Sequence, residues 1–199
     1  MGYHESLTEG RNAVLEAFRS GKTVDRLFVL DGCQDGPVKT ILREAKKQDT
    51  MVQYVKKERL DQLSETKNHQ GVIAYCAACE YAEVSDILEN AKKKGEAPFI
   101  VLLDGIEDPH NLGAIIRTAN QAGAHGVIIP KRRAVGLTAT VARTSAGAVN
   151  YTPVAKVTNL VTVMEDLKKE GMWFVCADMD GEEMYSLKFE GTYRSCHWK

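Results

Sequence analysis

The chain contains 199 residues with a mass of 22.0 kDa, a length that fits one large domain or two small ones. Hydrophobic residues make up 44% of the chain, enough for real cores, and the formal net charge of -1 gives no support for nucleic-acid binding from overall charge. The start of the chain is polar and no apolar run approaches the ~20 residues of a membrane span, so we expect neither a signal peptide nor a transmembrane helix.

The cysteines and histidines indicate a reduced protein without a metal site. The five cysteines are odd in number and irregularly spaced, which is typical of a cytoplasmic protein. Cys76 and Cys79 have the spacing of half a zinc site, but the chain offers no second pair and no nearby histidine couple. We therefore expect structural thiols, no metal and a cytoplasmic location.

The first part of the chain, residues 1–78, alternates between strand and helix patterns. This alternation predicts a small α/β sandwich whose strands are covered by helices. A polar stretch at 79–97, with apolar residues at helical spacing, predicts a linker helix. The expected elements are a helix at 9–19, a strand at 26–30, a helix at 38–47, a strand at 51–55, a helix at 58–63 and a strand at 72–75.

The second part, residues 98–199, repeats the order of a strand followed by a helix. Such βα units predict a parallel, doubly wound sheet. No Gly-x-Gly-x-x-Gly follows Leu103 and no Gly-Lys-Ser or Gly-Lys-Thr loop occurs, which disfavours a dinucleotide fold and a P-loop. The expected strands are 99–103, 126–129, 151–154 and 173–177, and the expected helices are 112–121, 138–144 and 159–169.

The segment 108–117 is the most informative part of the chain. It leads from the apolar strand at 99–103, through a polar turn with Asn111, into a helix that presents Arg117. Ligands of open α/β sheets bind beyond the carboxyl ends of the strands, so this turn should stand at a site. The alternative is an ordinary turn, in which Asn111 caps the helix and Arg117 lies on a solvated face.

Basic residues gather locally despite the neutral total. Lys131, Arg132 and Arg133 follow a strand end on the expected ligand side of the sheet, which favours RNA contact. For Lys92–Lys94 a solvated helix face is the better interpretation. Ser145 lies outside any Gly-x-Ser-x-Gly elbow, so a serine hydrolase is disfavoured, and the small residues around it are interpreted as allowing a helix end to approach the sheet closely.

Several separated segments resemble one protein family. Residues 108–119, Asp-Pro-His-Asn-Leu-Gly-Ala-Ile-Ile-Arg-Thr-Ala, resemble the first signature motif of the SpoU family. These are SPOUT-class RNA ribose 2′-O-methyltransferases that use S-adenosylmethionine. Residues 10–17 and 69–74 look like the two ends of the small RNA-binding domain of the family's bacterial 23S rRNA guanosine enzymes. Residues 144–148, followed by 151–154, also match the catalytic domain.

The resemblance implies a fold, a mechanism and partners. It implies a parallel-sheet domain with a trefoil knot, in which Arg117 activates the ribose hydroxyl and Asn111 positions the site. It also implies an RNA-binding role for Arg11, Asn12 and His69 in the first domain. S-adenosylmethionine would be the cofactor, RNA and in particular 23S rRNA the partner, and a homodimer the assembly, with no role for a membrane.

The end of the chain departs from the family pattern. Two later motifs, Gly-x-Glu-x-Gly and a Ser-Leu-Asn segment that completes the knot and the cofactor cleft, are not found. Ala177 and Asp178 remain as candidate cofactor contacts, and residues 192–199 are expected to form neither a strand nor a helix. The methyltransferase domain at 98–199 is therefore expected to be incomplete at its C-terminus.

A one-nucleotide frameshift is our hypothesis for this ending. One choice of codons for residues 192–199, read one nucleotide later, encodes Pro-Ile-Ala-Leu-Val-Ile-Gly, and Trp198 followed by Lys199 forces the glycine. Three functions stay open from the sequence: an RNA 2′-O-methyltransferase, a catalytically inactive RNA-binding remnant without the cofactor motifs, and an unrelated α/β domain with a small-molecule ligand.

Overall fold

The computed structural model describes residues 6–177, 180–183, 186 and 194–198, with the backbone alone at 6 and 194–198. The chain divides into two compact units. Unit 1 comprises Met1–Glu80 with Gly136–Ala139, and unit 2 comprises Tyr81–Val135 with Thr140–Lys199. None of the helices in the described ranges is long and apolar enough to cross a membrane.

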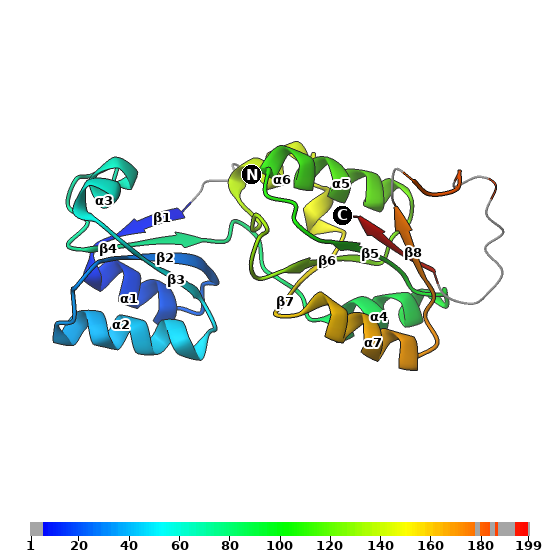
Figure 1. Ribbon diagram of the computed structural model, residues 1–199, viewed down its shortest axis with the longest axis horizontal. Helices are drawn as coiled ribbons and strands as arrows, with labels where there is room; N and C mark the ends of the chain where they lie inside the picture. The colour runs from blue at the N-terminus through cyan, green and yellow to red at the C-terminus, as the bar shows by residue number, and fades with distance from the viewer. Residues whose placement is uncertain (1–5, 178–179, 184–185, 187–193, 199) are drawn as a thin grey trace. The chain divides into compact units, whose positions relative to one another are not determined.

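Unit 1 is built on a four-stranded mixed sheet with the order β1-β4-β2-β3 (Figure 1). Strand β2 pairs with β3 in parallel and with β4 antiparallel, and β4 also pairs antiparallel with β1. The edge strand β1 was not anticipated from the sequence. The elements are β1 (Ser6–Glu9), α1 (Arg11–Arg19), β2 (Val24–Leu30), α2 (Gly36–Lys47), β3 (Met51–Val55), α3 (Lys57–Leu63) and β4 (Val72–Cys76).

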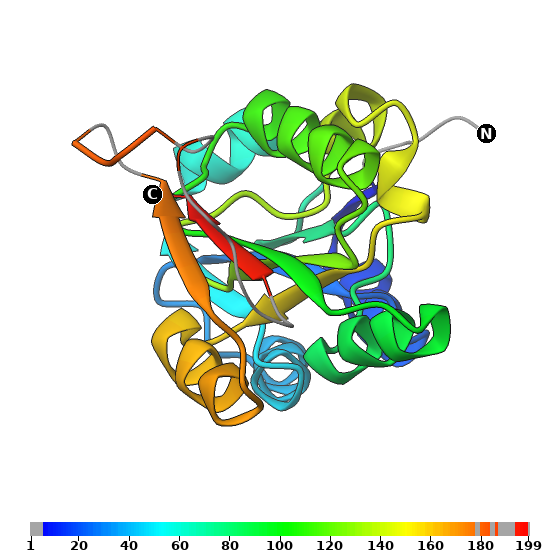
Figure 2. The ribbon, with the colours of Figure 1, turned by 90° about the vertical axis from the view of Figure 1, so that its right-hand side faces the viewer.

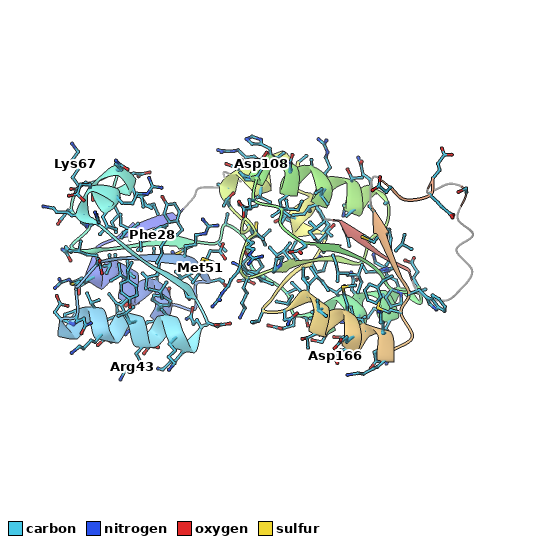
Figure 3. All side chains as sticks on the ribbon, viewed as in Figure 1. Phe28, Arg43, Met51, Lys67, Asp108 and Asp166 are labelled. Atoms are coloured by element: carbon cyan, nitrogen blue, oxygen red, sulfur yellow. The ribbon has the colours of Figure 1, made fainter. Side chains whose placement is uncertain are left out.

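Helices cover both faces of this sheet, as the sequence predicts. On one face, Val14 of α1 and Ile41 of α2 join a buried cluster with Leu27 of β2. On the other face, Leu60 of α3 packs with Phe28, whose side chain Figure 3 labels. Each helix thus buries its apolar side against the strands.

The elements from residue 81 onward surround a five-stranded parallel sheet with the order β7-β6-β5-β9-β8. Figure 2 shows α5 and α6 on one face of this sheet and α4 and α7 on the other. The doubly wound parallel sheet expected from the sequence is therefore confirmed. The elements are α4 (Val84–Lys94), β5 (Phe99–Leu103), α5 (Pro109–Gln121), β6 (Gly126–Pro130), α6 (Ala139–Thr144), the 3-10 helix η1 (Ala148–Asn150), β7 (Val154–Val157), α7 (Leu160–Lys169), β8 (Phe174–Ala177) and β9 (Arg194–Trp198).

The stretch interpreted as a linker contributes a core helix. Ile87 of α4 is fully buried in one cluster with Ile100 of β5 and Ile128 of β6. A Cβ atom at Gly126 would lie 2.6 Å from Ile87 Cδ1, so a side chain larger than hydrogen would not fit there. Helix α4 therefore belongs to unit 2, and its apolar spacing serves packing.

Two expectations about strands were wrong. The sequence placed a strand at 151–154, but the structure forms η1 just before it, and β7 runs from Val154 to Val157. The sequence also gave residues 192–199 no regular structure, whereas β9 pairs in parallel with both β5 and β8. The sequence of β9 is polar and does not look like a strand. It forms one because β5 and β8 supply backbone hydrogen bonds on both of its sides.

Candidate active site

The turn before α5 is closed by Asp108. Its Oδ1 accepts a hydrogen bond from the backbone N–H of His110 at 2.9 Å, and Pro109 occupies the first helical turn. Figure 3 labels Asp108 at this entry. Since Asp108 is the cap, the alternative in which Asn111 caps the helix does not hold. Asn111 is exposed at the carboxyl end of the sheet, where its amide is open to a ligand.

Arg117 lies on the same helix, outside the buried stripe. Leu112, Ile116 and Ala119 form that stripe, whereas Arg117 is exposed. Within the described residues its guanidinium has no ion-pair partner. The side chain therefore offers a full positive charge and a fork of donors to a partner from outside the chain.

Helix α5 touches α6 at unusually short range. A Cβ atom at Gly113 would lie 2.7 Å from Thr144 Cβ and 3.0 Å from the backbone N of Ser145, so only glycine fits. One turn earlier, His110 Nδ1 lies 3.5 Å from Thr144 Oγ1. Small residues at the end of α6 thus pack helix against helix, where the sequence suggested contact with the sheet. Arg117 follows Gly113 by four residues on the same helix and is exposed.

The loops after β5 and β6 meet at the carboxyl edge of the sheet. The N–H of Val135 donates to the carbonyl oxygen of Ile106 at 2.9 Å, which joins the loop that leads to Asp108 with the loop of the basic residues. Arg132 and Arg133 are exposed, and Lys131 is half-buried. The positive charges predicted from the sequence therefore lie on a loop that is bonded to the motif loop.

The proposed cofactor residues lie at the end of β8. Ala177 is exposed, and Asp178 lies outside the described residues. The register pairs Leu103 of β5 with Trp198 of β9, and Trp198 with Ala177 of β8. Three strands therefore end at one edge. Ala177 is thus the exposed last residue of β8 at this edge, and its role in cofactor binding stays a prediction.

In unit 1 the structure brings together two distant sequence segments. Arg11 Nε donates to the carbonyl oxygen of Gln70 at 3.1 Å, and the Gln70 Oε1 accepts the Arg11 backbone N–H at 3.2 Å. The Arg11 guanidinium also forms a 2.6 Å ion pair with Asp35. A cavity of about 390 Å³ opens here, in unit 1 and not in the unit of Asn111; its lining residues are Arg11, Leu30, Cys33, Gln70 and Gly71.

The other two residues expected to bind RNA in unit 1 differ in exposure. Asn12 is exposed at the start of α1. His69 is only 6% exposed, and its Nδ1 accepts the Gly71 N–H while its Nε2 lies 3.0 Å from Asp61 Oδ1. Both ring nitrogens are thus engaged inside the unit, and the RNA-binding role of His69 stays a prediction. Cys33 and Gln70, which line the cavity, were not candidates from the sequence, although Gln70 lies in the segment 69–74 that resembles the family's RNA-binding domain.

Two family models match the chain. The SpoU rRNA Methylase family matches residues 98–196, and the family described as RNA 2'-O ribose methyltransferase substrate binding matches residues 7–82. The first match spans the sheet that carries Asn111 and Arg117. The second spans the sheet that carries the cavity.

Curated relatives match over most of the chain. A putative TrmH family tRNA/rRNA methyltransferase, YacO of Bacillus subtilis, is 48% identical over 174 residues, which cover 87% of this chain and 70% of the relative. A putative TrmH family tRNA/rRNA methyltransferase of Staphylococcus haemolyticus is 45% identical over 176 residues, or 88% of this chain and 70% of that protein.

Solved structures share the fold. An rRNA methyltransferase from Sinorhizobium meliloti superimposes with a TM-score of 0.51 and 23% identity, covering 96% of this chain and 70% of the other. The SpoU methyltransferase AviRb from Streptomyces viridochromogenes, solved with AdoMet, gives 0.52 and 21%, covering 98% and 73%. With two family models in the expected order and relatives at nearly half identity, this chain belongs to the SpoU (TrmH) family of RNA methyltransferases.

Proposed function

We propose that the protein transfers the methyl group of S-adenosylmethionine to a ribose 2′-hydroxyl of 23S rRNA. In this division of labour, residues 1–78 bind the RNA and 98–199 carry the chemistry, and 79–97 connect the two parts through α4, which packs on the second sheet. The description of the model that matches residues 7–82 supports a ribose target. The rRNA methyltransferase from Sinorhizobium meliloti, solved with AdoMet, supports the cofactor and the class of RNA.

One observation carries the proposal: Arg117 is exposed, without an ion-pair partner in the described residues, on the helix that starts at the carboxyl edge of the parallel sheet. Ligands of open α/β sheets bind at this edge, where charged side chains can contact them. An arginine that serves stability alone would gain from a carboxylate partner. Arg117 has none to compete with a ribose or a phosphate.

The chemistry asks little of the protein beyond alignment and charge. S-adenosylmethionine supplies, when bound, a methyl group that its sulfonium has made electrophilic. A bond from the 2′-oxygen to this methyl carbon would replace the carbon–sulfur bond, and the hydroxyl proton would have to leave. A guanidinium with a pKa above ~12 is a poor base. Arg117 instead stabilises the negative charge that develops on the oxygen, and an RNA phosphate oxygen accepts the proton.

Asn111 and the basic loop complete the assignment. The Asn111 amide, less than two turns before Arg117, orients the ribose through its donor and acceptor groups. Arg132 and Arg133, with Lys131, hold phosphates of the RNA backbone and fix its register. Ala177, together with Asp178, would hold the cofactor at the end of β8. We further propose that the protein acts in the cytoplasm as a homodimer.

Transfer of labelled methyl from S-adenosylmethionine to RNA tests the proposal. The expected result is label in 23S rRNA that resists alkaline hydrolysis at one position, because a 2′-O-methyl group removes the nucleophile of that cleavage. Label in a base, with the backbone still cleaved by alkali, would contradict the ribose target. RNA binding without any transfer would favour the alternative of an RNA-binding protein that lacks catalysis.

A further inference from the structure

The residues that line the cavity of unit 1 are held in place by the strands, the helix and the loops around it. Strand β2 ends at Leu30 and β4 begins at Val72, and the Leu30 N–H donates to the Gly71 carbonyl oxygen at 2.8 Å. Leu30 and Gly71 therefore form one wall of the cavity, at the end of the antiparallel pair β2 and β4. Arg11, at the start of α1, and Cys33, in the loop after β2, form the rest.

Gly71 keeps the cavity open. Its φ of +84° is a conformation that L side chains rarely adopt, and a Cβ atom there would meet Leu30 Cβ at 3.5 Å and Cys33 Sγ at 3.9 Å. A side chain at this position would therefore project among the lining groups. The glycine serves both the turn and the empty space beside it.

The loop that carries Gln70 and Gly71 is clamped by Glu9. The Glu9 carboxylate accepts hydrogen bonds from Ser64 Oγ at 2.5 Å, Thr66 Oγ1 at 2.7 Å and the Glu65 N–H at 2.6 Å. His69 fastens the same loop from inside through Gly71 and Asp61. The cavity wall is thus pre-organised, which lowers the entropic cost of binding a ligand.

The charge of the cavity argues against a phosphate as its ligand. Asp35 Oδ2 lies 2.6 Å from Arg11 Nη2, so the positive charge is already balanced by a carboxylate. A phosphate would have to compete with that carboxylate and be repelled by it. What remains is a guanidinium plane held at two points, an apolar wall of Leu30 and the amide of Gln70. A flat, uncharged ring with polar edges suits this lining.

We propose that this cavity receives one unpaired nucleobase of the RNA substrate. The inference rests on the proposed function in taking RNA as the ligand of unit 1. The volume of about 390 Å³ is ample for one base and its ribose. The base stacks on the Arg11 guanidinium beside Leu30, and its edge accepts hydrogen bonds from the Gln70 amide. The site therefore selects RNA loops over duplexes, in which the bases are already stacked.

Cys33 makes the proposal testable in the unmodified protein. Its thiol is half-buried in the lining, whereas Cys176 is exposed in unit 2 and Cys76 is buried. Burial raises the pKa of the Cys79 thiol, which slows its reaction as well. Brief treatment with N-ethylmaleimide, followed by peptide mass mapping, reports the alkylation of each cysteine separately.

The experiment compares two RNAs of equal length at equal bound fraction. A hairpin with a single-stranded loop is expected to slow alkylation of Cys33 at least about fivefold, and a fully paired duplex is expected to leave it unchanged. Equal protection by both RNAs would mean that the backbone, not a base, covers the cavity, and no protection by the bound hairpin would mean that the cavity is not used. Either result overturns the proposal.

A filled cavity gives the second measurement. Cys33→Phe should weaken binding of the hairpin about tenfold or more, because the loss of one stacked base costs roughly that much. Gln34→Phe places the same ring on the exposed neighbour and should bind like the parent. If Cys33→Phe binds the hairpin normally, the proposal fails; if this variant does not fold, the alkylation comparison still decides.

The result is separable from the proposed function. Hairpin protection of Cys33 in a protein that transfers no methyl group would support the cavity and contradict the methyltransferase proposal. Methyl transfer that is unchanged in Cys33→Phe would do the reverse.

Discussion

Arg11 in unit 1 and Arg117 in unit 2 belong to the two segments that most resemble known motifs, but their surroundings are opposite. Arg11 is held by the Asp35 carboxylate and the Gln70 carbonyl oxygen. Arg117 is exposed and has no ion-pair partner in the described residues. A held guanidinium offers a fixed surface with its charge balanced, which suits the recognition of shape. A free one keeps its charge for a group that becomes negative during a reaction.

The largest effect expected from this comparison follows the removal of the free guanidinium. Arg117→Ala should lower kcat for methyl transfer about 100- to 1000-fold, because it removes charge stabilisation in the transition state. Arg11→Ala should act mainly through a higher KM for RNA. Steady-state kinetics on both variants, with circular dichroism as a check of folding, measure the contrast. A loss below about tenfold for Arg117→Ala would break it.

The α5–α6 seam, which is the close contact of Gly113 with Thr144 and Ser145, should tolerate no added methyl group. Gly113→Ala is expected to destabilise the protein by about 1–3 kcal/mol, because the new Cβ would overlap Thr144 and the backbone of α6. Gly36→Ala is the matched control: no atom lies within 4 Å of its Cβ, and its φ is unstrained. That variant should be neutral or slightly more stable. Urea unfolding of both proteins decides, and equal midpoints would argue against the tight seam.

The basic loop after β6 should reveal itself through salt. If Arg132 contacts a phosphate, Arg132→Ala reduces the slope of log K against log salt by about 0.7–0.9 and weakens binding to all RNA sequences alike. Lys93→Ala is the control, since Lys93 pairs with Glu89 at 3.0 Å on an exposed helix face. A slope that is unchanged in Arg132→Ala, or equally reduced in Lys93→Ala, would remove this loop from the RNA interface.

The smallest effect concerns the clamp under the cavity. Burial alone would raise the pKa of Glu9, but the hydrogen bonds from Ser64, Thr66 and Glu65 outweigh it and lower that pKa. A carboxyl whose pKa is lower in the folded state stabilises the fold above its unfolded pKa, and this stability is lost as the pH falls through the folded pKa.

Wild-type protein should therefore be more stable than Glu9→Gln at neutral pH, and the gap should close below about pH 4. Thermal unfolding of both proteins at a series of pH values from about 3 to about 7 measures this difference in stability. Glu16→Gln, at an exposed position of α1, should instead follow the wild type at every pH. A constant gap for Glu9→Gln would show that the carboxylate charge does not contribute.

The sequence predicted what depends on local pattern. The apolar run at Phe99–Leu103 and the helix after it appear as expected, because burial on both faces and an amphipathic stripe leave clear periodicity. Arg117 lies on an exposed face, which the alternative interpretation of this segment had also expected. Both Asp108 and Asn111 have side chains that can cap a helix, so the sequence alone did not decide between them. The structure shows that Asp108 caps α5.

What the sequence did not predict depends on distant partners. The apolar spacing of α4 was compatible with a linker until Ile87 was seen in the core. The cavity is formed by residues near positions 11, 30 and 70, and no spacing rule connects them. The burial of His69 likewise follows from Asp61, which stands on another element. In each of these instances tertiary contacts decide what the local pattern leaves open.

The position of β9 within its sheet determines the order in which the two sheets can form during synthesis. The sheet of unit 1 has all four of its strands once the chain reaches Cys76, so this sheet can form while the ribosome still adds residues. In the second sheet, β9 lies between β5 and β8, and both of these are synthesised before it. Two unpaired strand edges must wait for residues 194–198, and during that interval the nascent chain is most exposed to mispairing and most in need of a chaperone.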